Sequence, residues 1–195
     1  MPYVQQTDRT SLDDMLNYLV KAARIVKCET DVPRLNHPID SLADEINAMR
    51  QLLNNQEVVF VGLLNYCIHD ILLHLMPEIR YWVIALNAGW LKRTAHRFEA
   101  HSPDAVFVLY EHERILNCFS AEFTWKHVAE YISIHLACKV APNQSRDTQD
   151  LIAGVFYNIH DELADRLWRP YEDKQKLKNG DLPKYLDWIT QIKQK

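Results

Sequence analysis

Residues 58–75 read VVFVGLLNYCIHDILLHL, and they form the longest apolar run of this 195-residue chain. Four polar side chains interrupt the run: Asn65, His69, Asp70 and His74. A stretch of about 18 residues with such interruptions would barely span a bilayer. We therefore expect a helix buried at the centre of a globular protein, and we expect no contact with a membrane.

The composition around this run favours helices joined by short connections. Only four residues are glycine, and glycine supplies the positive φ angles that tight turns between strands require. Apolar residues make up 48% of the chain and charged residues 25%, both ordinary for a globular protein. We predict a single all-α domain over residues 1–195, folded as a helical bundle of about seven or eight helices.

Apolar spacing, capping residues and prolines place the predicted helices along the chain. Ser11 is expected to cap the first helix, and Asp147 or Thr148 the seventh. Pro170 is expected to end the seventh helix because proline has no backbone N–H, which would leave residues 171–181 as a polar tail. The predicted helices cover about residues 12–27, 41–53, 58–75, 79–100, 104–118, 120–139, 148–168 and 185–192.

An internal repeat is predicted between residues 62–101 and residues 127–170. The alignment pairs Tyr66 with Tyr131, and it pairs Arg97 with Arg166. Each half then consists of two antiparallel helices, so the fold would contain two duplicated helical hairpins about a pseudo-twofold axis. The alternative is a chance similarity between amphipathic helices.

A set of acidic and histidine side chains is divided between the two helices of the second repeat. If these helices pack antiparallel, the set faces across them, as in bundle proteins that hold divalent metals. Glu162 and Asp165 also have the i,i+3 spacing of all-helical nucleotide pyrophosphohydrolases, although the upstream Glu-Glu-x-x-Glu motif of those enzymes is absent. The hypothesis is a metal-dependent nucleotide or phosphoester hydrolase, and the alternative is a solvated charged face with ion pairs along each helix. Its candidate metal ligands are His127, Glu130, Asp161, Glu162 and Asp165.

A basic stretch with aromatic neighbours is the third candidate site. Lys92, Arg93 and Arg97 follow Trp90 on the fourth predicted helix, and basic and aromatic side chains together can contact phosphates and bases. The net charge of −4 and the pI of about 6.1 argue against broad nucleic-acid binding. Nucleic-acid binding is therefore a weaker hypothesis than a solvated basic face opposite a core face.

Three short segments carry a family resemblance. They are the opening Met1-Pro2-Tyr3-Val4 with Asp8-Arg9 and Leu12-Asp13, the middle Gly62-Leu-Leu-Asn65-Tyr66-Cys-Ile68, and a polar stretch near the end. With them, the chain resembles an uncharacterised family of small proteins encoded largely by bacteriophages. The motif residues near the end are Glu162, Arg166, Pro170, Tyr171, Glu172, Asp173, Lys174, Asn179, Gly180 and Asp181.

The resemblance implies a phage or prophage origin and a cytoplasmic role in an infected or lysogenic bacterial host. Residues 1–6 lack the basic region and apolar core of a signal peptide, which agrees with that location. The leading hypothesis is a helical interaction protein that binds a host or phage macromolecule, with a protein partner or homo-oligomer expected. The chain has nine Tyr, six Phe and five Trp, and aromatic residues are enriched in protein interfaces. Whether it is an enzyme stays open, and a divalent metal is the one cofactor considered.

Overall fold

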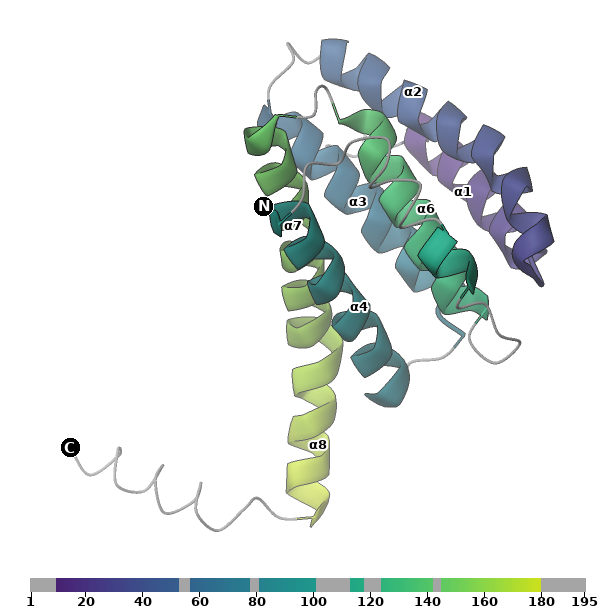
Figure 1. Cartoon of the computed structure of the whole chain (residues 1–195). Coiled ribbons are helices and arrows are strands. Elements are labelled where there is room, and N and C mark those ends of the chain that lie inside the picture. The colour runs from purple at the N-terminus through teal and green to yellow at the C-terminus, as the bar shows by residue number, and fades with distance from the viewer. Residues whose placement is uncertain are drawn as a thin grey trace.

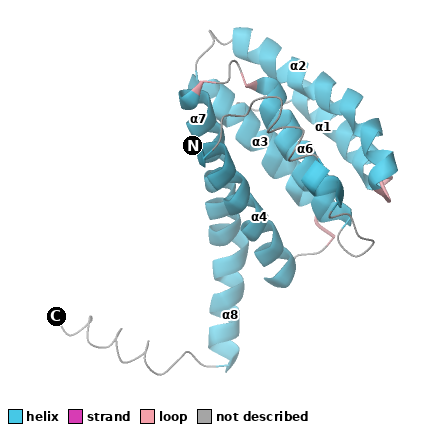
Figure 2. Ribbon diagram, viewed as in Figure 1, coloured by secondary structure: helices cyan, strands magenta, loops and turns pink. Residues whose placement is uncertain are grey.

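The computed structural model of the chain describes residues 10–52, 57–77, 81–100, 113–117, 124–141 and 145–179. Over these residues the regular structure is entirely helical, which confirms the predicted all-α bundle (Figures 1 and 2). The α-helices with bounds inside the described residues are α1 (Thr10–Arg24), α2 (Asn36–Leu52), α3 (Glu57–Leu75), α4 (Tyr81–Ala100), α6 (Thr124–Val140), α7 (Arg146–Leu163) and α8 (Arg169–Asn179). A 3₁₀ helix (Glu29–Leu35) precedes α2, and a π-helical segment (Ala164–Trp168) joins α7 to α8.

Helix α3 lies at the centre of the bundle, as its apolar run predicts. It packs against α1, α2, α6 and α7, so side chains on several of its sides are enclosed. Phe60, Leu64, Ile68 and Ile71 are buried almost completely. A helix that is apolar on most sides needs neighbours on most sides. Among the described residues, no helix combines the length and the apolar character needed to cross a bilayer.

The most extensive helix contact joins α4 to α7. The ring of Phe156 on α7 stacks on Phe98, with centroids 5.7 Å apart and planes 13° from parallel. Phe156 also meets Trp90 edge to face at 6.2 Å. The buried indole N–H of Trp90 donates to Asn87 Oδ1 at 3.1 Å, so this polar atom is satisfied within the core.

The repeat predicts that α3 packs on α4 and that α6 packs on α7, and the structure differs in both cases. Neither α3 with α4 nor α6 with α7 forms an extensive contact among the described residues; α7 packs on α4 and α3, while α6 packs on α2 and α3. The cause is that α6 is buried on nearly all sides, so several other helices must cover it. The internal repeat itself (62–101 and 127–170) stays a prediction. Its aligned tyrosines do make similar bonds: Tyr66 donates to Asp13 at 2.5 Å, and Tyr131 donates to Asn36 at 3.0 Å.

Several helix ends differ from the predicted ones. Helix α1 already includes Thr10, so Ser11 lies inside it, and α2 begins at Asn36 with Pro38 in its first turn. Proline is tolerated there because the first N–H groups of a helix have no intrahelical partner. The cap of α7 is Ser145, whose hydroxyl accepts the N–H of Thr148 at 3.3 Å.

Pro170 does not end the helix, and the residues after it are helical up to Asn179. Immediately before it, the N–H of Arg169 donates to the carbonyl of Ala164, five residues back, which is a π-type bond. This change of hydrogen-bond register places Pro170 in the first turn of α8, where its missing N–H is tolerated. Residues 171–179 are therefore part of a helix rather than a polar tail. Residues 113–117 are helical, and the rest of the predicted fifth helix and all of 185–192 lie outside the described residues.

The α4–α7 contact should dominate the stability of this half of the bundle. Replacing Phe156, which is fully buried, with alanine should lower the free energy of unfolding by about 3–5 kcal/mol in chemical denaturation. Leu52→Ala is the matched control, since Leu52 is 81% exposed and its loss should change stability by less than about 0.5 kcal/mol. Equal effects of the two substitutions would contradict this core assignment.

Candidate functional site

The two predicted metal ligands on α6, His127 and Glu130, are both buried. Glu130 has cationic partners: Arg114 Nη2 lies 2.5 Å from Oε1, and Lys126 Nζ lies 3.8 Å from Oε2. These partners compensate its negative charge in the interior. The pair with Arg114 also ties the helical residues 113–117 to α6.

The two aspartates of the predicted set are exposed. Asp161 lies on α7, and Asp165 lies on the π-helical segment that follows α7. Asp161 Oδ1 lies 3.0 Å from the ring of the adjacent His160, and Asp165 pairs with Arg169 one turn later. Both side chains are largely exposed, at 73% and 56%. The alternative of a solvated face with ion pairs along the helix describes these two residues.

Glu162 is the one member of the set that points into the protein from α7. Its Oε2 lies 3.0 Å from Nδ1 of His69 on α3, and both side chains are mostly buried. Glu162 therefore faces α3 rather than α6, and the five predicted ligands do not converge. Over the residues that the structure describes, no three His, Cys, Asp or Glu side chains are placed to hold a metal ion.

Burial and the charges around His69 act on its pKa in different directions. Burial lowers the pKa of His69, the carboxylate of Glu162 opposes this effect, and the guanidinium of Arg166 adds to it. Glu162 Oε1 is buried and has no hydrogen-bond partner. Glu162 also lies just before the π-helical segment, and such segments occur frequently at functional sites. We call His69, Glu162 and Arg166 the α3–α7 site.

A second polar contact lies where α3 meets α1. Tyr66 donates to Asp13, and His74 Nδ1 lies 3.2 Å from Asp70 Oδ2. Burial raises the pKa of Asp70, the charge of Asp13 adds to this, and His74 opposes it. Helix α3 therefore directs polar side chains toward two neighbours, with His69 toward α7 and Tyr66 toward α1.

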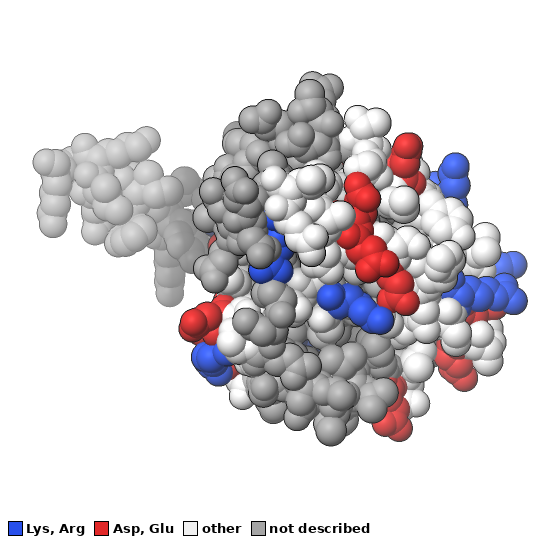
Figure 3. Space-filling model, turned by 90° about the horizontal axis from the view of Figure 1, so that it is seen from above, with Lys and Arg blue, Asp and Glu red and all other residues white. Residues whose placement is uncertain are grey.

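The predicted basic contact residues lie on α4 and differ in their exposure. Lys92 and Arg93 are exposed, whereas Arg97 is half-buried and interacts within the protein. Adjacent positions on a helix point about 100° apart, so the two exposed cations diverge. On the face shown in Figure 3, Lys and Arg side chains of the described residues are interspersed with Asp and Glu.

The motif residues near the end have mixed positions. Glu162 pairs with His69, while Arg166 is exposed. Trp168 donates its indole N–H to Glu172 at 2.6 Å, which stabilises the junction of the π-helical segment with α8. Asp173 and Lys174 are exposed, Tyr171 is 37% exposed, and Gly180 and Asp181 lie outside the described residues.

Sequence reasoning missed His69 as the partner of Glu162. The available signal was the interruption of an apolar run by His69 and Asp70, because a buried polar side chain needs a partner from a neighbouring helix. The identity of that helix is a property of the packing, since the two residues are 93 positions apart in the chain (162 − 69).

The fold and the α3–α7 site define an all-α protein with a central helix and a buried ionisable pair. The family model described as Domain of unknown function (DUF6899) matches residues 1–131, about two thirds of the chain, so the chain belongs to this family. The match includes the opening and middle segments that carry the resemblance, and the motif at 162–181 lies beyond it. Comparison with curated proteins and with solved structures gives no match.

The buried position of His69 should be visible in its titration. We expect an NMR titration, with His69→Gln to assign the resonance, to give a pKa below the ordinary value of about 6.5. In Glu162→Gln the pKa should fall further, because the opposing negative charge is gone.

The same shift predicts a pH dependence of stability. Because the pKa of His69 is lowered in the folded state, the unfolded chain binds more protons at this residue than the folded chain does once the pH falls below about 6.5. The contribution of neutral His69 to stability is therefore present above that pH and is lost below it. Wild type should therefore lose more stability on acidification than His69→Gln does. An ordinary or raised pKa, or identical pH profiles, would contradict the buried position of His69.

Proposed function

We propose that this protein acts by binding another protein through the outer face of α1. The supporting observation is a pair of large exposed apolar side chains, Tyr18 on that face at 53% exposure and Ile25, the residue directly after α1, at 59%. Tyr18 lies in the second half of α1, and Ile25 follows directly on the last residue of the helix, Arg24. Exposed Asp14 and Lys21 lie on the same face and supply charges of both signs beside them.

The exposed residues are separate from those that hold α1 in the bundle. Leu12, Leu16 and Leu19 are buried on the opposite face and account for the packing of α1 on its neighbours. Tyr18 and Ile25 can therefore contribute to a binding surface without a role in the core. Tyrosine gives much contact area at low entropic cost, and it is enriched among residues that dominate binding energy.

A phage or prophage origin and a role in the cytoplasm of an infected or lysogenic bacterium belong to the same proposal. They rest on the resemblance of the opening and middle segments to largely phage-encoded proteins, and both segments lie within the matched residues. The partner is then a host or phage protein. A second copy of this chain is the alternative occupant of the same face.

The outer face of α1 can be tested by comparing two variants. In affinity capture from the bacterial host, with a chemical crosslinker, wild type should retain a defined partner that Tyr18→Ser/Ile25→Ser loses. Leu52→Ser is the matched control, because it removes an exposed apolar side chain from α2 instead. Thermal unfolding must show that all three proteins fold.

The sedimentation velocity of the purified proteins separates the two kinds of partner. A dimer of wild type that the double variant converts to a monomer would identify a second copy as the occupant. The proposal fails if the double variant and wild type show the same captured proteins and the same mass.

A metal-dependent phosphoester hydrolase is the second candidate, and one observation favours it. Glu162 holds His69 with one oxygen, while its other oxygen is buried and has no hydrogen-bond partner. A buried carboxylate oxygen is a ligand suited to Mg²⁺ or Mn²⁺, and a neutral imidazole beside it can accept a proton from water. Of the five metal ligands predicted from the sequence, this candidate site retains Glu162 alone, and His69 takes the place of the other four.

For this candidate, purified protein should contain or take up Mn²⁺, and should hydrolyse a nucleoside triphosphate or p-nitrophenyl phosphate when Mn²⁺ is present. Glu162→Gln should abolish the turnover, whereas Asp161→Asn, which alters the exposed neighbouring carboxylate, should retain it. Protein without bound metal and without stimulated turnover would remove this candidate.

A further inference from the structure

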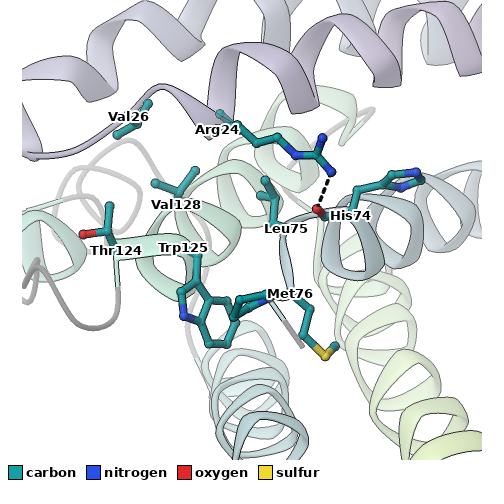
Figure 4. Close-up of a pocket in the computed structure, with 10 residues that line it drawn as sticks. Arg24, Val26, His74, Leu75, Met76, Thr124, Trp125 and Val128 are labelled. Carbon is teal, nitrogen blue, oxygen red and sulfur yellow. Dashed lines mark hydrogen bonds between the residues drawn. The ribbon is translucent and has the colours of Figure 1, made fainter. Parts of the chain in front are cut away.

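A cavity of about 360 Å³ lies where the ends of α1 and α3 meet the beginning of α6 (Figure 4). Its volume falls in the lower part of the range of pockets that bind small molecules. Val26, Leu75 and Val128 contribute apolar surface from the three segments, and the indole of Trp125 contributes an aromatic one. The cavity involves neither the α3–α7 site nor the exposed Tyr18 and Ile25.

Arg24 supplies a fixed positive charge to the lining of this cavity. Its Nη2 donates to the carbonyl of His74 at 3.0 Å, near the end of α3, as Figure 4 shows. A guanidinium has five N–H donors, so an arginine held by this one bond keeps others for a ligand. Among the described residues no carboxylate lies within ion-pair distance of Arg24, and Asp70 is occupied by His74.

The beginning of α6 adds to the positive potential. Thr124 and Trp125 are the first two residues of this helix, and both line the cavity. The first turn of a helix carries the positive end of the helix dipole. A cation, a helix beginning and an aromatic ring therefore border one small space with a mixed polar and apolar lining.

We propose that this cavity binds a small molecule with a flat apolar body and one anionic group, such as an aromatic carboxylate or sulfonate. The apolar body packs against Trp125, Leu75 and Val128, and the anion is bound by Arg24. A charge-assisted bond to a guanidinium is among the stronger single polar contacts in proteins. The negative net charge of the chain makes this local cation a feature of the cavity rather than of the whole surface.

Two fluorescent probes that differ by one charge test the proposal. The probe 8-anilinonaphthalene-1-sulfonate has the proposed chemistry, and N-phenyl-1-naphthylamine has the same apolar body without the sulfonate. Titrated into the folded full chain, the sulfonate should bind saturably with one site. Arg24→Gln should weaken sulfonate binding by about tenfold and leave the neutral probe nearly unchanged.

Two further variants keep the test specific. Val128→Trp fills the cavity and should remove both probes, provided that its thermal unfolding remains cooperative. Arg34→Gln changes another exposed arginine, which is paired with Asp31 and lies outside the cavity, and it should bind both probes as wild type does. The proposal is overturned if sulfonate binding is not saturable, or if Arg24→Gln and Arg34→Gln give the same affinity for it.

Discussion

The enclosure of α3 is the constraint on which the rest of the structure depends. This helix is apolar on most sides, so it must be covered by other helices, yet it carries His69 and Asp70 inside the same run. A buried polar group without a partner costs several kcal/mol, on the order of 2–7. Helix α7 therefore brings Glu162 to His69, and α1 brings Asp13 to Tyr66. On both neighbours these partners lie beside buried apolar residues, such as Ile159 on α7 and Leu12 on α1.

The burial of α6 has a parallel effect on the other polar side chains. Glu130 is compensated by Arg114 and Lys126, so its charge is used to hold residues 113–117 and α6 together. With Glu162 directed to α3, the interior has separate ionic contacts rather than one shared cluster. The two binding surfaces proposed above, the outer face of α1 and the cavity beside Arg24, lie outside these ionic contacts.

The sequence predicts helices better than it predicts their neighbours. The run at 58–75 differs from α3 by one residue at its start, because continuous apolar character and the following Pro77 are local signals. The partner of Glu162 could not be predicted from the sequence. Residues on nearly all sides of α6 are buried, so the apolar pattern of α6 does not show which of its sides, if any, would face α7. The helical path through Pro170 depends on the π-type bond to Ala164, which has no signature in the sequence. The exposure of Tyr18 does follow from the period of α1, since the buried leucines occupy the opposite face of this helix.

In this bundle Glu162 reaches across to α3 and not to α6. A double-mutant cycle between His69→Gln and Glu162→Gln, measured by chemical denaturation at about pH 7, tests it most directly. We predict a coupling energy of about 0.5–3 kcal/mol for this pair, and additive effects within about 0.5 kcal/mol for His127→Gln combined with Glu162→Gln. Additivity of the His69 pair together with coupling of the His127 pair would contradict the arrangement of the bundle described above.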